Sequence, residues 1–214
     1  MTSRVTRVLA ALAGAATILA WSAPVVAQDA DPAPRRAEGD GPFDKLIIRG
    51  ATLIDGQGGP PRGPVDIVIE KNRISQVVDV GYPGLPIDAS RRPKGPAREL
   101  DATGMYVMPG LIDLHVHTCG KPKAPDAEYC YKLWMAHGIT TVRGVPLGGF
   151  EWSASEAKRS AANEITAPRL VNYQRPGSGK GWTGGQITTP EKAREWVRWA
   201  KTQGIDGLKV GAHE

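Results

Sequence analysis

Strand-like and helix-like segments alternate through the second half of this sequence, and this alternation constrains the fold more than any other feature. Apolar patterns typical of strands occur at residues 111–117, 139–145, 168–173 and 205–210. Helical patterns lie between them at residues 125–138, 153–164 and 188–204. Such repetition predicts a parallel sheet with right-handed crossovers. A doubly wound sheet and a (β/α)₈ barrel both begin in this way, and a dinucleotide fold loses support because no G-x-G-x-x-G motif follows the first strand.

The length of this segment predicts an incomplete barrel. A complete (β/α)₈ barrel takes about 250 residues. The chain has 214 residues in all, and the alternation occupies residues 109–214. We therefore expect residues 109–214 to form the first four β/α units of a truncated barrel.

The N-terminus has the layout of a secretory signal peptide. Arg4 and Arg7 precede an apolar run from Val8 to Ala23, and small residues then offer a cleavage site after Ala27. The run is short for a membrane-spanning helix, which needs about 20 apolar residues. An uncleaved anchor is the alternative. We expect residues 1–27 to be removed and the mature chain to be exported, either periplasmic or secreted, with no stable membrane insertion.

The first half of the mature chain predicts a β-rich unit. Residues 28–44 are polar and rich in proline and glycine, which is typical of a linker. Two β-rich runs separated by a tight polar turn at residues 70–72 then predict a hairpin. We expect residues 45–108 to form part of an N-terminal β-sandwich. The predicted fold class is therefore α/β, a partial β-sandwich domain followed by the first half of a TIM-type barrel.

Composition and charge exclude other classes of protein. Hydrophobic residues make up 41% of the chain and charged residues 23%, which is ordinary for a globular protein. No basic stripe is interleaved with aromatic residues, so binding of nucleic acid is not supported. An exported protein meets an oxidising compartment, where Cys119 and Cys130 are permitted to pair. A disulfide and two separate thiols both remain open, because the sequence does not give the distance between their Cα atoms.

Two histidines stand in the apolar run "LIDLHVH". Side chains at positions i and i+2 share one face of a strand, so His115 and His117 point the same way, and Asp113 falls on their face. Two neutral imidazoles one pleat apart can bind one metal ion. They lie near the C-terminal end of the first strand, where barrel enzymes have their active sites. A weak site for metal storage or structure is the alternative.

The sequence also resembles a known family. The segments "LIIRGATLIDGQG", "VDIVIEKNRISQV" and "ELDATGMYVMPGLIDLHVH" resemble the opening of the metal-dependent amidohydrolase superfamily. In that family a set of β-sandwich strands precedes a (β/α)₈ barrel. The resemblance is close over residues 45–145 and looser up to residue 210. Within the superfamily, "GITTVRGV" and "GIDGLKV" are most similar to exported relatives of imidazolonepropionase and Xaa-Pro dipeptidases.

The resemblance implies a set of metal ligands. It assigns His115 and His117 from the first barrel strand, and Lys209 at the end of the fourth strand as a carboxylated residue that bridges two metal ions. A carbamate on Lys209 supplies two anionic oxygens, whereas an ammonium group cannot bind a cation. The alternative for Lys209 is an ordinary surface lysine. Asp113 is expected to orient a ligand histidine, with a strand-capping role as its alternative. The cofactor implied is one or two divalent ions, with zinc expected.

The implied reaction is hydrolysis of an amide-type C–N bond in a small amide or dipeptide-like substrate. The family also uses histidines from strands five and six and a catalytic aspartate from strand eight, and this sequence contains no such strands. His213 fits none of these positions, and His137 is placed to contact the last carbonyls of a helix. The glycine-rich loop at 174–187 follows the third strand, where it either covers substrate or is a mobile connection. The alternative function is a truncated, catalytically inactive fragment.

Overall fold

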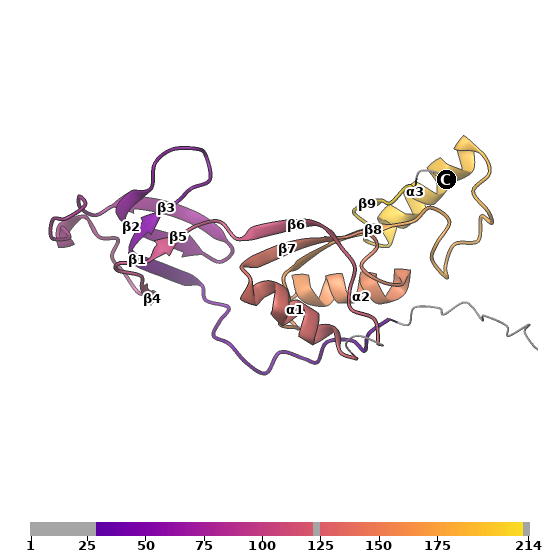
Figure 1. Cartoon of the computed structure of the whole chain (residues 1–214), viewed down its shortest axis with the longest axis horizontal. Helices are drawn as coiled ribbons and strands as arrows, with labels where there is room; N and C mark the ends of the chain where they lie inside the picture. The colour runs from indigo at the N-terminus through magenta and orange to yellow at the C-terminus, as the bar shows by residue number, and fades with distance from the viewer. Residues whose placement is uncertain (1–28, 122–124, 212–214) are drawn as a thin grey trace, which may run out of the picture.

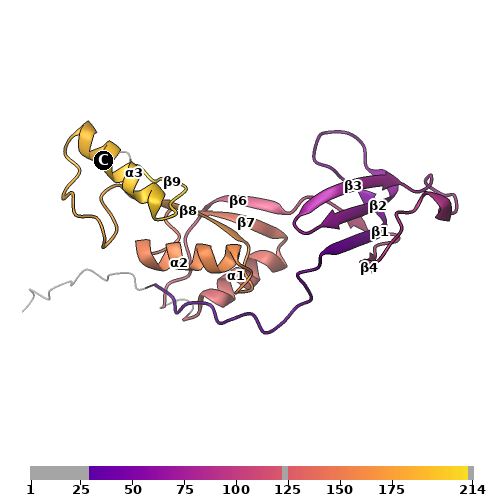
Figure 2. The ribbon, with the colours of Figure 1, turned by 180° about the vertical axis from the view of Figure 1, so that it is seen from behind.

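The computed structural model describes residues 29–121 and 125–211, which form two regions that follow one another along the chain (Figures 1 and 2). The first region is a β-sheet, and the second is a parallel sheet with helices. The predicted signal peptide at 1–27 lies outside the described residues, as does His213. None of the described helices is long and apolar enough to cross a membrane.

Five strands form one mixed sheet in the first region, in the order β3-β2-β1-β4, with β5 also paired to β1. Antiparallel β2 and β3 are joined by the tight turn at residues 71–72, which confirms the predicted hairpin. The described residues of this region form this one sheet, so the second layer of the predicted β-sandwich stays a prediction. The elements are β1 Lys45–Leu53, β2 Arg62–Glu70, β3 Arg73–Asp79, the 3-10 helix η1 Ala89–Arg91, β4 Arg98–Asp101 and β5 Tyr106–Val107.

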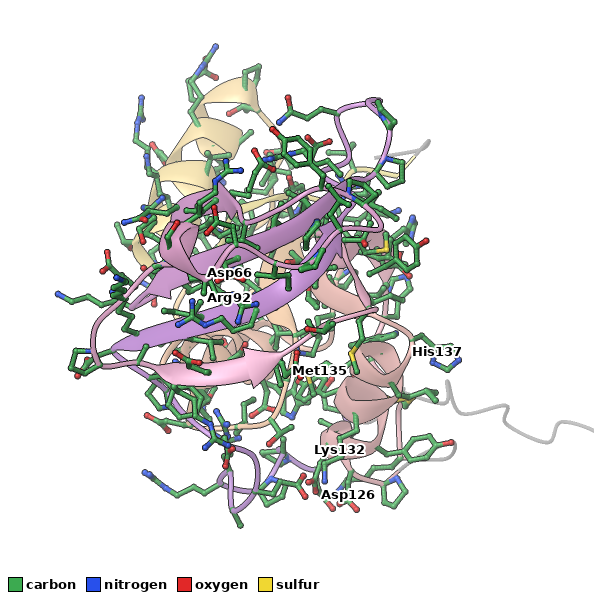
Figure 3. All side chains as sticks on the ribbon, turned by 90° about the vertical axis from the view of Figure 1, so that its left-hand side faces the viewer. Asp66, Arg92, Asp126, Lys132, Met135 and His137 are labelled. Carbon is green, nitrogen blue, oxygen red and sulfur yellow. A yellow bond between two sulfur atoms is a disulfide. The ribbon has the colours of Figure 1, made fainter. Side chains whose placement is uncertain are left out.

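A buried carboxylate joins two strands of this sheet to the segment after η1. Asp66 on β2 is fully buried, and its carboxylate accepts hydrogen bonds from Arg49 Nη1 at 2.7 Å and from the Gly50 backbone nitrogen at 2.8 Å. Arg92 Nε lies 3.5 Å from the same carboxylate (Figure 3). Arg49 also donates to Glu99, and this hydrogen bond raises the pKa of the Arg49 guanidinium. These partners offset the desolvation of the buried charge.

We predict that Asp66→Asn lowers the free energy of unfolding by about 3 kcal/mol, because it leaves the Arg49 guanidinium without its buried counter-charge. Urea unfolding followed by circular dichroism measures this loss. Glu99→Gln is the matched control, since the Glu99 side chain is 52% exposed and its removal should cost much less. Equal unfolding midpoints for Asp66→Asn and the wild type would contradict the prediction.

Four parallel strands form the sheet of the second region, in the order β6-β7-β8-β9. One helix follows each of the first three strands, so the predicted β/α alternation is confirmed. The curled parallel sheet is that of a partial TIM-type barrel. The elements are β6 Leu111–Val116, α1 Ala127–Ala136, β7 Ile139–Gly144, α2 Phe150–Ala161, β8 Arg169–Gln174, α3 Pro190–Thr202 and β9 Gly207–Leu208.

Local capping chemistry explains where these helices begin and end. The Thr189 side chain accepts a hydrogen bond from the Lys192 backbone nitrogen at 3.3 Å. This contact is that of an N-cap residue, so the predicted N-cap of α3 is confirmed. Gly204 and Gly138 follow the ends of α3 and α1 with φ of 81° and 77°, a backbone conformation that glycine adopts without steric cost. Asp126 is at the predicted N-cap position of α1, but its side chain makes no cap hydrogen bond.

An apolar core lies between this sheet and its helices. α1 and α2 cover one face of the strands, and the opposite face of β6 and β7 carries no described helix (Figures 1 and 2). Val116, Val142 and Leu170 come from three successive strands and are buried in one cluster with Tyr131 of α1. Because strand side chains alternate between faces, the neighbours of Val116 on β6 face away from this core.

The segment at residues 29–44 runs along α1 and α2 (Figure 1). It contains no helix or strand, as expected of a linker, but it is fixed by contacts that composition did not indicate. Asp31 forms a parallel β-bridge with Asp126 at the start of α1. The Ala33 nitrogen donates to the carboxylate of Glu156, which is buried on α2. This segment is therefore part of the helical layer of the half-barrel.

Candidate metal centre

β6 places two imidazoles side by side. His115 lies on the strand and His117 directly follows it, with ring centroids 5.3 Å apart in an edge-to-face arrangement. Both histidines are exposed, whereas Val116 between them is buried in the core beneath the helices. The two rings therefore stand at the carboxyl end of β6, on the face away from the helices, where the two-residue period of a strand predicts them.

A backbone carbonyl orients the ring of His117. Its Nδ1 lies 2.7 Å from the carbonyl oxygen of Pro146, which follows β7. A carbonyl only accepts hydrogen bonds, so Nδ1 carries the proton and donates, and in the neutral ring Nε2 keeps its lone pair. Metal-binding histidines are fixed by the same kind of contact. The His115 and His117 pair thus has donor atoms of the kind that suit a divalent metal ion, and Nε2 is the donor atom that His117 offers.

The contacts of Asp113 differ from those expected of a group that orients an imidazole. Its carboxylate accepts a hydrogen bond from the backbone nitrogen of His115 at 3.0 Å. The pairing of β6 with β7 is irregular between Asp113 and Val116. Within this irregular stretch, the Leu114 carbonyl accepts a hydrogen bond from Arg143 Nε at 2.6 Å. Asp113 therefore contacts the backbone that carries His115, and both roles expected of it stay predictions.

Lys209 lies at the other edge of the sheet. It directly follows β9, and its backbone nitrogen donates to the Gln174 carbonyl at 2.9 Å. Lys209 and the histidines share the carboxyl end of the sheet, but three strand spacings, about 14 Å along the sheet, separate them. Among residues 29–121 and 125–211, no group of three or more His, Cys, Asp or Glu side chains is placed to hold a metal ion. The structure therefore brings His115 and His117 together at one edge of the sheet, and Lys209 follows the strand at the other edge.

An open pocket of about 870 Å³ lies beside His117. Its polar lining comes from three distant parts of the chain, namely Asp29, His117, and the segment with Gln174, Arg175 and Ser178. Gln174 ends β8, and Arg175 and Ser178 belong to the glycine-rich loop after it. The loop therefore forms a wall of a pocket next to the candidate ligands, and the pocket presents both a carboxylate and a guanidinium group.

Two polar residues near the site were not anticipated from the sequence. The Asp29 carboxylate accepts a hydrogen bond from the Gly149 nitrogen at 2.9 Å, just before α2. The Arg143 guanidinium carbon lies 5.0 Å from the ring centroid of Tyr173, on the neighbouring strand β8. The sequence could have indicated that Arg143 lies on the open face of β7, because it alternates with Val142, which is buried. Asp29 had none, because its partner lies 120 residues away.

The two cysteines form a disulfide, which decides between the alternatives that the sequence left open. Cys119 and Cys130 are bonded with their Cα atoms 6.3 Å apart, so the loop after His117 is joined to α1. At the other end of α1, His137 Nδ1 lies 2.8 Å from the Leu133 carbonyl oxygen. Figure 3 shows His137 and Asp126 at opposite ends of this helix. The prediction that His137 contacts the last carbonyls of a helix is confirmed.

Comparison with known proteins finds relatives that match part of this chain. The N-acyl-D-aspartate deacylase of Alcaligenes xylosoxydans xylosoxydans is 37% identical over 113 residues, which are 52% of this chain and 18% of the deacylase. The dihydroorotase of Trichlorobacter lovleyi is 32% identical over 132 residues, which are 59% of this chain and 26% of the dihydroorotase. No family model matches the chain. The chain thus spans about a quarter or less of these relatives.

Solved structures share the fold. A crystal structure of a Xaa-Pro dipeptidase with bound methionine superposes with a TM-score of 0.53 at 21% identity, covering 77% of this chain and 46% of the dipeptidase. The parallel sheet and its helices form a partial TIM-type barrel, with a small β-sheet before it. Over the part that its relatives match, the chain belongs to the metal-dependent amidohydrolase superfamily.

We predict that neutral His117 carries its proton on Nδ1, because Pro146 offers it only an acceptor. Two-dimensional ¹⁵N–¹H spectra that correlate ring nitrogens with ring protons, recorded above the pH at which histidine titrates, distinguish the two tautomers. His137 makes the same kind of contact and serves as an internal reference. A proton on Nε2 of His117 would contradict the orientation described above.

Proposed function

We propose that this chain is the N-terminal part of an exported metal-dependent hydrolase that cleaves an amide-type C–N bond in a small amide or dipeptide-like substrate. The observation that carries the proposal is the pair His115 and His117, with the His117 ring oriented by a backbone carbonyl. The relatives support it, because the deacylase, the dihydroorotase and the Xaa-Pro dipeptidase are named for enzymes that hydrolyse C–N bonds.

In this proposal His115 and His117 hold one or two divalent ions, with zinc expected. When bound, such an ion lowers the pKa of a coordinated water and polarises a carbonyl group. Asp113 keeps the backbone of His115 in place, and the Pro146 carbonyl keeps the lone pair of His117 aimed away from β7. Lys209 contributes as a carbamate, because its ammonium form cannot bind a cation. The remaining ligands are proposed to come from strands that follow β9 in a complete barrel.

The substrate is proposed to occupy the pocket beside His117. The pocket opens at the carboxyl ends of the strands, where barrel enzymes have their active sites. The glycine-rich loop after β8 lines it with Arg175 and Ser178. A guanidinium and a hydroxyl suit the polar groups of an amide or a dipeptide-like molecule. We further propose the domain division of the sequence analysis, with residues 45–108 as part of a β-sandwich and 109–214 as the first half of the barrel.

A truncated fragment without activity is the second candidate function. It is favoured by one observation, namely that the described residues supply a pair of histidines but no cluster of three metal-binding side chains of the His, Cys, Asp and Glu types. Turnover of dipeptides or N-acyl amino acids by purified residues 28–214 with added zinc or manganese distinguishes the two. Activity that His115→Ala abolishes would defeat the fragment hypothesis. Absence of turnover, with activity in a chain extended past Glu214, would support it.

We predict that His117→Ala lowers the zinc retained by the protein after dialysis at least tenfold, because the remaining imidazole is a single ligand. Metal analysis by mass spectrometry measures the content per chain. His137→Ala is the matched control, since this histidine contacts the Leu133 carbonyl at the end of α1, away from β6, and its loss should leave the content unchanged. Equal zinc in wild type and His117→Ala would refute the ligand assignment. Zinc retained without turnover, even in a chain extended past Glu214, would instead support a storage or structural site.

We also predict that the exported chain begins at Gln28, after cleavage of residues 1–27. The Cys119–Cys130 disulfide supports export, because such bonds persist in oxidising compartments. N-terminal sequencing of protein recovered from the periplasm or the medium tests the prediction. Protein that retains its first residues in the membrane fraction would instead support the uncleaved anchor.

A further inference from the structure

The disulfide joins the loop that carries His117 to a rigid helix. Cys119 follows His117 by two residues, and its partner Cys130 is on α1. Cys130 is 2% exposed, and its neighbours on the buried side of the helix, Ala127 and Tyr131, are not exposed at all. The Tyr131 hydroxyl also donates to the buried Glu156 carboxylate of α2 at 3.1 Å. The bond is therefore fixed at its helical end by the core of the half-barrel.

Polar contacts also hold the described part of this loop, among them the ion pair between Lys121 Nζ and the Asp31 carboxylate at 2.7 Å. After β6 ends, the Pro146 carbonyl accepts from the His117 ring and the Leu147 carbonyl accepts from the Thr118 nitrogen at 2.8 Å. Both partners lie in the loop after β7. The disulfide adds a covalent link on the other side, to α1. His117 is thus held between two separate parts of the barrel rather than by its own strand alone.

We propose that the Cys119–Cys130 disulfide is a positioning element for His117 that tightens metal binding at this site. This inference rests on the proposed function, in which His117 is a metal ligand. A ligand whose backbone is already ordered loses less conformational freedom when the ion binds, so the affinity is higher. The bond also prevents Cys119 from binding the ion itself. A free Cys119 thiolate would be a strong zinc ligand.

Titration with Co²⁺, followed by its visible absorption, tests the proposal on the exported chain. We expect the double variant Cys119→Ser/Cys130→Ser to bind Co²⁺ about tenfold more weakly than the wild type, a loss typical for groups that support metal ligands. Serine replaces both cysteines because it cannot supply a thiolate. Equal affinity of the double variant and the wild type would overturn the proposal.

Val65→Ala is the matched control for a general loss of stability. Val65 is fully buried in the sheet of the first region, far along the chain from His117, and its truncation costs stability without touching the half-barrel. We expect Val65→Ala to bind Co²⁺ as the wild type does. An equal loss of affinity in this control would show that the disulfide acts only through global stability, and would also overturn the proposal.

The proposed function and this inference fail in different ways. If the oxidised wild type binds no Co²⁺, or if His117→Ala binds it unchanged, the metal site itself is refuted and the positioning role with it. If the wild type binds through His117 and the double variant binds equally well, only the positioning role is refuted.

A second route covers a double variant that does not fold. The folded wild type is reduced with a water-soluble phosphine, in which one phosphine, one disulfide and one water give one phosphine oxide and two thiols. Both thiols are then alkylated and the reagents are removed before the Co²⁺ titration. We expect the same weakening of about tenfold. Unchanged affinity after complete reduction and alkylation would overturn the proposal.

Discussion

The candidate site depends on the pleat of β6. Val116 is buried beneath the helices, and the two-residue period then places His115 and His117 on the opposite face. Burial of a valine side chain stabilises the fold by about 1.5 kcal/mol or more. Shifting the strand by one residue would expose Val116 and bury two imidazoles, so both changes oppose the shift. The packing of one apolar residue thus keeps both rings on the open face.

Backbone groups of the loop after β7 also hold the residues at the end of β6. The carbonyls of Pro146 and Leu147, after β7, accept from the His117 ring and the Thr118 nitrogen. The same loop continues to Gly149, whose nitrogen donates to Asp29 from the N-terminal segment. Glu156, buried on α2, accepts from that segment as well. The loop after β7 therefore couples the orientation of a candidate ligand to the docking of a segment that begins the described chain.

The features that could be predicted from the sequence are those set by local spacing. The β/α alternation, the Thr189 cap and the shared face of the two histidines each depend on residues a few positions apart. The missed features depend on distant partners. Ala33 and Glu156 are 123 positions apart, so the sequence of residues 28–44 indicated only a linker. The disulfide stayed open for a related reason, because its formation depends on how the loop after β6 folds back onto α1. The second layer of the predicted sandwich stays a prediction, because the described strands of residues 45–107 form one sheet.

The two outer strands of the parallel sheet connect the fold to the proposed chemistry. Ile112 and Leu114 on β6 are 61% and 59% exposed, and Leu208 and Val210 at β9 are 40% and 59% exposed. Exposed apolar edges of this kind are normally covered or paired. The same two strands carry the histidine pair and Lys209, which lie about 14 Å apart along the sheet, whereas one zinc ion binds its ligands at about 2 Å. Further curling of the sheet around a common axis would bring both sets of side chains toward one metal centre. In the proposed enzyme, closing the barrel and completing the ligand set are therefore the same structural requirement.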